Sequence, residues 1–121
     1  KVDRTMGLMA FLATKYGKVT RGEYAGCGMG LGNDHGKKIE INAEANQLLF
    51  IKGFKEVARI NVKEIDSFNI ASDNNRETTV DINWKNGKKS TVVLSKLDPQ
   101  GKPWPQDRVS LVLRALDLSK N

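Results

Sequence analysis

Hydrophobic and polar residues alternate most regularly between residues 77 and 95. In the first half of this stretch, one side of the alternation is polar and the other carries Thr78, Val80, Ile82 and Trp84. A period of two is typical of a half-buried strand. A second β-rich run ends at Ser95, and the Asn86–Gly87 pair between the two runs is the strongest short-range hairpin signal. The pattern therefore predicts a β-hairpin.

The register of this hairpin depends on the length of its loop. A two-residue turn would set polar residues of the first strand opposite apolar residues of the second. A three-residue loop, Lys85–Gly87 with a left-handed glycine at its end, sets Val80 opposite Val92 and Thr78 opposite Leu94. Because a slip of one residue moves every side chain to the other face, we predict the three-residue loop.

Other short apolar runs predict further strands. They open at Val19 and continue over residues 38–43, 47–52, 54–60 and 65–71, so that strands occupy about 18–95. Gly53 and residues 72–75 are typical of the turns and loops between strands. After the hairpin, the connection over residues 98–105 contains three prolines and cannot form a helix or a central strand.

Helical spacing occurs near both ends of the chain. Residues 5–16 place Met9, Leu12, Ala13 and Tyr16 on one helical face, and Gly17 stands where a helix would stop. We expect this helix to pack on the sheet rather than to lie in a membrane interface, because it lacks the basic polar face of an interfacial anchor.

The second predicted helix covers residues 106–119. Two apolar stripes run along it, formed by Val109, Val112, Leu113 and Leu116 and by Leu111, Ala115 and Leu118. More than half of its circumference is therefore apolar. A helix of this kind covers the open end of a sheet or also meets a partner.

Glycine alternates with apolar residues between these elements, at Gly26, Gly28, Gly30 and Gly32. In an extended chain Cys27, Met29 and Leu31 would share one face, and the bare glycine face would let another backbone approach. The spacing fits neither a phosphate-binding P-loop nor a dinucleotide fingerprint. We therefore expect a glycine-rich loop that serves backbone geometry and has no assigned ligand.

Composition adds a basic charge and few reactive groups. The chain of 121 residues is expected to form one domain, 1–121, and its 20 Lys and Arg against 14 Asp and Glu give a net charge of +6. This charge favours acidic partners without indicating a site. With Cys27 and His35 as its only cysteine and histidine, the chain can form neither an internal disulfide nor a Cys/His zinc site. A single cysteine suits a reducing compartment, so we expect a cytoplasmic protein.

The start of the chain carries no segment long enough to cross a bilayer. Its longest apolar run, Met6–Ala13, is too short for a transmembrane helix. It also lacks the flanks of a signal peptide. Because the chain begins at Lys1 rather than at methionine, we expect it to be part of a longer protein.

No residue pattern indicates catalysis, a metal or a cofactor, so we predict that the chain is not an enzyme. The carboxylates are spread singly and the only histidine lies near glycines. The stretch Lys52–Arg59 is similar to an RNA-recognition strand motif, but Glu56 and Arg59 occupy the positions of two of its aromatic residues. We interpret that match as chance, because the surrounding order of elements is different.

Basic residues border several predicted turns. The candidates for contact with an anionic surface are Lys37, Lys38, Lys85, Lys88 and Lys89. If these turns lie on one rim of the molecule, their lysines form an edge that attracts anions.

The order of elements resembles that of bacterial pleckstrin-homology-like (PH-like) domains. The likeness is carried by Lys38–Ile41, Leu49–Lys52, Lys63–Phe68, Asn86–Lys89 and the closing helix Val109–Leu118. It implies a mostly β (α+β) fold with about seven short antiparallel strands in two bent sheets, an N-terminal helix and a C-terminal capping helix. Such domains bind lipid head groups, peptides or proteins without catalysis. The lysine motif that binds phosphoinositides is not met, because Glu40 follows Lys38 where the motif has arginine.

These observations predict a non-enzymatic PH-like interaction module that binds a protein partner or a second copy of itself. The alternative is a binder of an anionic surface, membrane lipid or nucleic acid, through the turn lysines. Salt dependence distinguishes the two, because contacts to phosphate weaken steeply as salt rises.

Overall fold

Seven antiparallel strands and one α-helix make up the part of the chain that the computed structural model describes, residues 15–39 and 44–120. The strands are β1 (Lys15–Gly22), β2 (Gly28–Gly32), β3 (Gln47–Lys52), β4 (Lys55–Asn61), β5 (Ile65–Asp73), β6 (Glu77–Trp84) and β7 (Lys89–Ser95). The helices are the short 3-10 helix η1 (Val62–Glu64), the α-helix α2 (Arg108–Asp117) and its 3-10 extension η2 (Leu118–Lys120). No helix among the described residues is long and apolar enough to cross a membrane.

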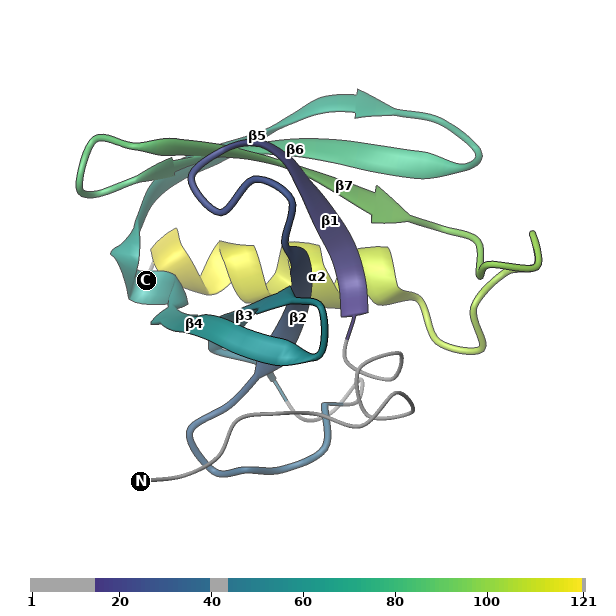
Figure 1. Cartoon of the computed structure of the whole chain (residues 1–121), viewed down its shortest axis with the longest axis horizontal. Coiled ribbons are helices and arrows are strands. Elements are labelled where there is room, and N and C mark those ends of the chain that lie inside the picture. The colour runs from purple at the N-terminus through teal and green to yellow at the C-terminus, as the bar shows by residue number, and fades with distance from the viewer. Residues whose placement is uncertain (1–14, 40–43, 121) are drawn as a thin grey trace.

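All seven strands belong to one sheet with the order β4-β3-β2-β1-β7-β6-β5. The prediction of two sheets is therefore wrong. The reason is that β1 pairs on one side with β2 and on the other with β7, which joins the two groups of strands. Figure 1 shows the sheet curving around α2, with β5, β6 and β7 above the helix and β3 and β4 below it.

The concave side of this sheet encloses the hydrophobic core. Inward-facing residues of β6 and β7 are almost fully buried there, with Val80, Val92 and Leu94 at 0–1% exposure. They pack in one cluster with Val112 and Leu116 of α2, as the sequence predicts. Asp107 caps the helix N-terminus by accepting a hydrogen bond from the backbone N–H of Ser110.

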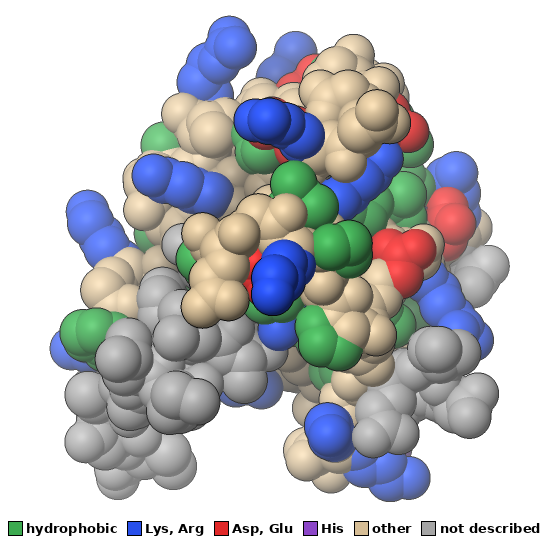
Figure 2. Space-filling view, turned by 90° about the vertical axis from the view of Figure 1, so that its right-hand side faces the viewer, with side chains coloured by type: hydrophobic (Ala, Val, Ile, Leu, Met, Phe, Trp, Pro, Cys, Tyr) green, Lys and Arg blue, Asp and Glu red, His purple; other side chains and the backbone are tan. Residues whose placement is uncertain are grey.

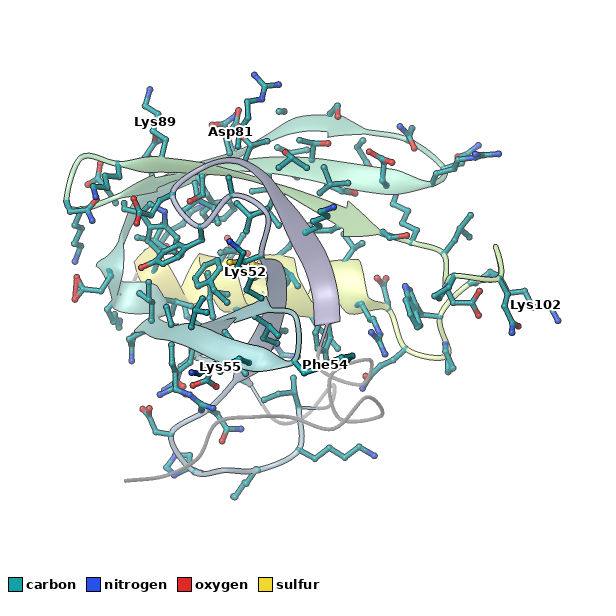
Figure 3. The ribbon with its side chains drawn as sticks, viewed as in Figure 1. Lys52, Phe54, Lys55, Asp81, Lys89 and Lys102 are labelled. Atoms are coloured by element: carbon teal, nitrogen blue, oxygen red, sulfur yellow. The ribbon has the colours of Figure 1, made fainter. Side chains whose placement is uncertain are left out.

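The β6–β7 hairpin confirms the predicted register. Val80 pairs with Val92 and Thr78 with Leu94, and the backbone N–H of Trp84 donates to the carbonyl of Lys88 at 2.9 Å. This pairing leaves residues 85–87 as the loop. Polar residues of the two strands face outward, and Figure 3 shows Asp81 projecting on that side of the sheet.

The loop depends on a left-handed glycine. Gly87 has φ +86°, and a Cβ built on it would meet no atom within 4 Å. Gly87→Ala should therefore cost only the backbone strain, on the order of 1 kcal/mol of unfolding free energy. Urea unfolding of the two proteins measures this. A loss as large as that of a core truncation would contradict the open surroundings of Gly87.

The predicted helix over residues 5–16 falls almost entirely outside the described residues. Its last two positions, Lys15 and Tyr16, form the start of β1 instead. At Gly17, which was expected to stop a helix, a Cβ would lie 2.7 Å from Leu94 Cδ2 and 2.9 Å from the carbonyl oxygen of Val93. Pairing with β7 therefore overrides the helical spacing of Tyr16 with the residues before it.

The glycine-rich stretch is a strand rather than a loop. Gly28, Gly30 and Gly32 lie in β2, and Gly26 occupies the preceding turn with φ +90°. The apolar residues between them, Cys27, Met29 and Leu31, are buried in the core, so the predicted alternation of faces is confirmed. The strand predicted over residues 38–43 is not seen at its described residues, Lys38 and Ile39, which are irregular; residues 40–43 lie outside the described residues.

Three other boundaries differ slightly from the expected ones. β4 begins and ends one residue later than predicted, at Lys55 and Asn61. β5 extends through Ser72 and Asp73, which were expected in a loop, because they pair with Thr79 and Thr78 of β6. The C-terminal helix was predicted from residue 106 but begins at Arg108, after its cap Asp107, and it changes from α to 3-10 geometry at Leu118.

Candidate functional site

The turn lysines do not form one rim. Lys15 at the start of β1 pairs with Gly30 in the middle of β2 and Lys18 with Gly28, so β2 ends beside the start of β1. Gly22 at the other end of β1 pairs with Ser90, next to the β6–β7 turn. Lys37 and Lys38 follow β2, so they lie at the opposite end of β1 from Lys85, Lys88 and Lys89. Figure 3 shows Lys89, the labelled member of this group, projecting above the sheet.

Charge on the surface is mixed as well as dispersed. Lys88 Nζ lies 3.2 Å from the carboxylate of Glu23, so part of the charge at the β6–β7 turn is balanced. Figure 2 shows Lys and Arg side chains at several separate points of one face, with Asp and Glu side chains near some of them. A single basic patch of the kind expected from the sequence is not present on that face.

The two residues considered for nucleophilic chemistry are also separated. Cys27 is buried immediately before β2, and His35 is exposed in the segment that follows β2. They therefore lie at opposite ends of that strand, and the described structure brings no histidine to Cys27. The Cys27 side chain instead packs in the core.

The most distinctive exposed surface lies along β5. Among the described strands, β5 pairs with β6 alone and forms one border of the sheet. Phe68 and Ile70 face the core side, because they pair with the buried Ile82 and Val80. Phe68 is half-buried, but Ile70 is 50% exposed.

Ile70 is exposed because the C-terminal helix covers only one end of β5. The α2 helix itself packs on β1 and β7, and its extension η2 contacts β5. Lys120 of η2 places its Nζ 4.8 Å from the ring centroid of Phe68. Towards the other end of β5, the core-facing side chain of Ile70 borders an open groove.

This groove, which we call the β5–α2 groove, has a volume of about 490 Å³. Its apolar lining comes from both sides: Ile70 of β5, Val109 and Leu113 of α2, and Pro103 and Trp104 of the connection. Its polar lining consists of Asp73, Thr78, Lys96, Gln106, Asp107, Arg108 and Ser110. The groove therefore combines apolar side chains with a larger set of polar and charged ones.

A carboxylate at the end of β5 forms one polar corner of the groove. Lys96 Nζ donates to Asp73 Oδ1 at 2.7 Å and to the carbonyl of Asn74 at 2.6 Å, and Thr78 Oγ1 donates to Asp73 Oδ1 at 2.8 Å. The hydrogen bond from Lys96, followed by that from Thr78, holds the pKa of Asp73 below its usual value. Asp73 is therefore ionised near neutral pH.

The start of α2 forms the opposite corner. Asp107 accepts from the N–H and the hydroxyl of Ser110 at 3.0 and 2.7 Å, and these bonds lower its pKa, the backbone bond most. The guanidinium of Arg108 lies over the Trp104 ring, 3.7 Å from its centroid, and 5.0 Å from the centroid of the Tyr16 ring. Burial lowers the pKa of Arg108 but leaves it charged. The stack fixes the connection against β1 and α2.

The Asp107 cap gives a prediction that depends on pH. Asp107→Ala should lower the unfolding free energy at pH 7 by about 0.5–2 kcal/mol, because it removes the N-cap. The pKa of Asp107 is depressed in the folded state, so the contribution of its charge is complete above the unfolded value of about 3.9 and is lost as pH falls through the folded pKa. Denaturant unfolding at pH 7 and in acid measures both effects.

A matched control is Asp107→Asn, since asparagine caps a helix but carries no charge. At pH 7 the unfolding free energy of this variant should be close to that of the wild type. Because asparagine carries no charge, its cap should not weaken as the pH falls. If the cost of Asp107→Ala were equal at both pH values, the charge of Asp107 would have no part in the cap.

The two carboxylates of the groove do not have the raised pKa that suits a general acid or base near neutral pH. A general acid or base works best with a pKa near the working pH. Both carboxylates at the corners, Asp73 and Asp107, have a lowered pKa instead, and both are already engaged in hydrogen bonds.

Sequence reasoning missed the groove because its lining comes from β5, β6, α2 and the connection between β7 and α2, which include segments distant along the chain. Two signals pointed to parts of it: the apolar residues Phe68 and Ile70 of the predicted strand 65–71, and the apolar stripe of the C-terminal helix that contains Val109 and Leu113. The sequence predicted a helix that covers the sheet or also meets a partner. It did not show which strand faces that helix across the groove.

Comparison with models of known protein families, with curated proteins and with solved structures finds no match for this chain.

Proposed function

We propose that this chain is a non-enzymatic, PH-like interaction module that binds a protein partner through the open edge of β5 and the β5–α2 groove. The observation that carries the proposal is the half-exposed Ile70, which faces the core side of a border strand next to an apolar groove. An extended segment can add to such an edge through backbone hydrogen bonds and place alternate side chains in the groove.

The order of elements supports the PH-like part of the proposal. Seven antiparallel strands are followed by a C-terminal helix that packs on the concave side of the sheet, as the resemblance implies. The departure is that β1 joins all of the strands into one sheet. The proposal for binding rests on the edge and the groove, and it does not depend on the family.

The test is selection from a phage-displayed library of random peptides, with the purified chain as target. The informative variant is Ile70→Lys, and its matched control is Val57→Lys. Ile70 and Val57 are both 50% exposed and lie on the two border strands of the sheet, so the two variants change charge and exposed surface alike.

We expect enriched peptides with alternating apolar and polar residues that bind the wild type and Val57→Lys but not Ile70→Lys. Bound peptide should shift the backbone amide NMR signals of β5. Equal binding to both variants, or failure to enrich any peptide, would overturn the proposal. Salt-sensitive co-sedimentation with anionic vesicles, lost on charge reversal of Lys85, Lys88 and Lys89, would favour the anionic-surface alternative instead.

A further inference from the structure

The two borders of the sheet differ in how they resist pairing with another strand. On β4, Lys55 and Arg59 are exposed and Glu56 is buried and paired with Arg59 at 2.7 Å. Charged residues on an edge, and charges that point inward, are the devices that keep edge strands from pairing with other chains. On β5, every residue from Ser67 to Ser72 is uncharged. The border at β4 is protected, and the border at β5 is not.

The central part of β5 is also regular. Its pairing with β6 is irregular between Ile65 and Ser67 and again between Ile70 and Ser72. The residues from Ser67 to Ile70 between these irregularities pair with β6 in unbroken register. This short run presents a regular edge on which another strand can form hydrogen bonds.

We infer that the occupant of this edge is a second copy of the chain, with the two β5 strands antiparallel around a two-fold axis at Asn69. This inference rests on the proposed function and names its partner. In this register Phe68 of one copy lies opposite Ile70 of the other, so core-facing apolar residues meet on one face. Shifting the axis by one residue, to Phe68, would instead set Asp66 opposite Ile70.

The same register is favourable for charge. The regular run from Ser67 to Ile70 carries no charged residue, so no like charges are directly opposed within it. Lys120 lies over the Phe68 ring near one end of β5, and the ionised Asp73 lies at the other end. In the antiparallel pair, the Lys120 end of one copy therefore lies beside the Asp73 end of the other. A two-fold interface forms these contacts twice, because the same patch serves both copies.

The net charge of +6 opposes self-association at long range, so the measurement belongs at physiological salt, where the screening length is about 8 Å. Sedimentation velocity of the whole chain over a range of concentrations should show a reversible dimer. Ile70→Lys should be monomeric at concentrations where Val57→Lys still forms the dimer. Thermal unfolding followed by circular dichroism checks that both variants are folded.

A cysteine pair tests the register separately. Residues directly opposite in antiparallel strands have Cα atoms about 4.5–5.5 Å apart, which suits a disulfide. Asn69→Cys should therefore form a disulfide-linked dimer on mild oxidation. Ser67→Cys should not, because its two copies would lie more than about 10 Å apart. Cys27 is buried and is common to both proteins, and the wild type controls for it.

A monomer at all concentrations would overturn this inference, as would a dimer that Ile70→Lys leaves intact or equal cross-linking of the two cysteine variants. These failures differ from failure of the proposed function. A monomeric chain that still binds selected peptides along β5 would keep the groove as a binding site for another protein.

Discussion

Leu116→Ala should lower the free energy of unfolding by about 2–5 kcal/mol, because it leaves a cavity in a packed core. Leu116 has 0% exposure and belongs to the cluster that α2 forms with the inward residues of β6 and β7. The measurement is urea or guanidinium unfolding followed by tryptophan fluorescence, since Trp84 lies in the same cluster.

The matched control is Leu113→Ala on the same helix. The two substitutions delete the same atoms and change helix propensity alike, but Leu113 is only partly buried and lines the β5–α2 groove. Its cost should be clearly smaller. Equal losses, or a loss at Leu116 below about 1 kcal/mol, would mean that α2 does not close the core as described.

Gly22→Ala should lower the free energy of unfolding by about 2–5 kcal/mol, the second large effect. Gly22 has φ +81°, for which a residue with a Cβ loses about 1–2 kcal/mol. Its Cβ would also lie 2.0 Å from the backbone carbonyl oxygen of Lys89, which accepts the N–H of Glu23. Because both groups are backbone, relief requires β1 and β7 to separate, at a cost of about 1–3 kcal/mol.

Gly26→Ala is the control for Gly22→Ala. Gly26 belongs to the same turn between β1 and β2 and has φ +90°, but a Cβ there meets nothing within 4 Å. Its cost should be the backbone strain alone, about 1–2 kcal/mol. Thermal or urea unfolding of both variants separates strain from collision. Similar losses of unfolding free energy in the two variants would show that β1 and β7 move apart at little cost to make room for the Cβ at residue 22.

Local patterns were sufficient where neighbouring residues determine the structure. The β6–β7 register follows from alternation and from the Asn86–Gly87 turn, and both are local along the chain. β3 has the predicted bounds, Gln47–Lys52, because it is a short apolar run between turn residues. The faces of β2 follow from the alternation of glycine with apolar residues.

Long-range pairing decided the rest. Tyr16 has helical spacing with the residues before it, yet it lies in β1, which pairs with both β2 and β7. The same pairing makes one sheet where two were expected. Ile70 was expected in a strand over residues 65–71, but its core-facing side follows from its pairing with Val80, and its exposure follows from how far the C-terminal helix covers β5. The turn lysines looked alike in sequence, whereas the strand order sends them to opposite ends of β1.

The position of β1 between β2 and β7 constrains the order in which the chain can fold. β2, β3 and β4 pair with their neighbours in sequence, as do β5, β6 and β7, so each group closes shorter loops than the β1–β7 pair does. The β1–β7 pair joins opposite ends of the described sheet-forming region. Bringing these distant segments together costs chain entropy, and that cost must be met before the contacts of the pair can stabilise the fold. During synthesis β1 would emerge long before β7, with one edge open until the last strand arrives. Joining β1 to β7 should therefore be the late, slow step of folding.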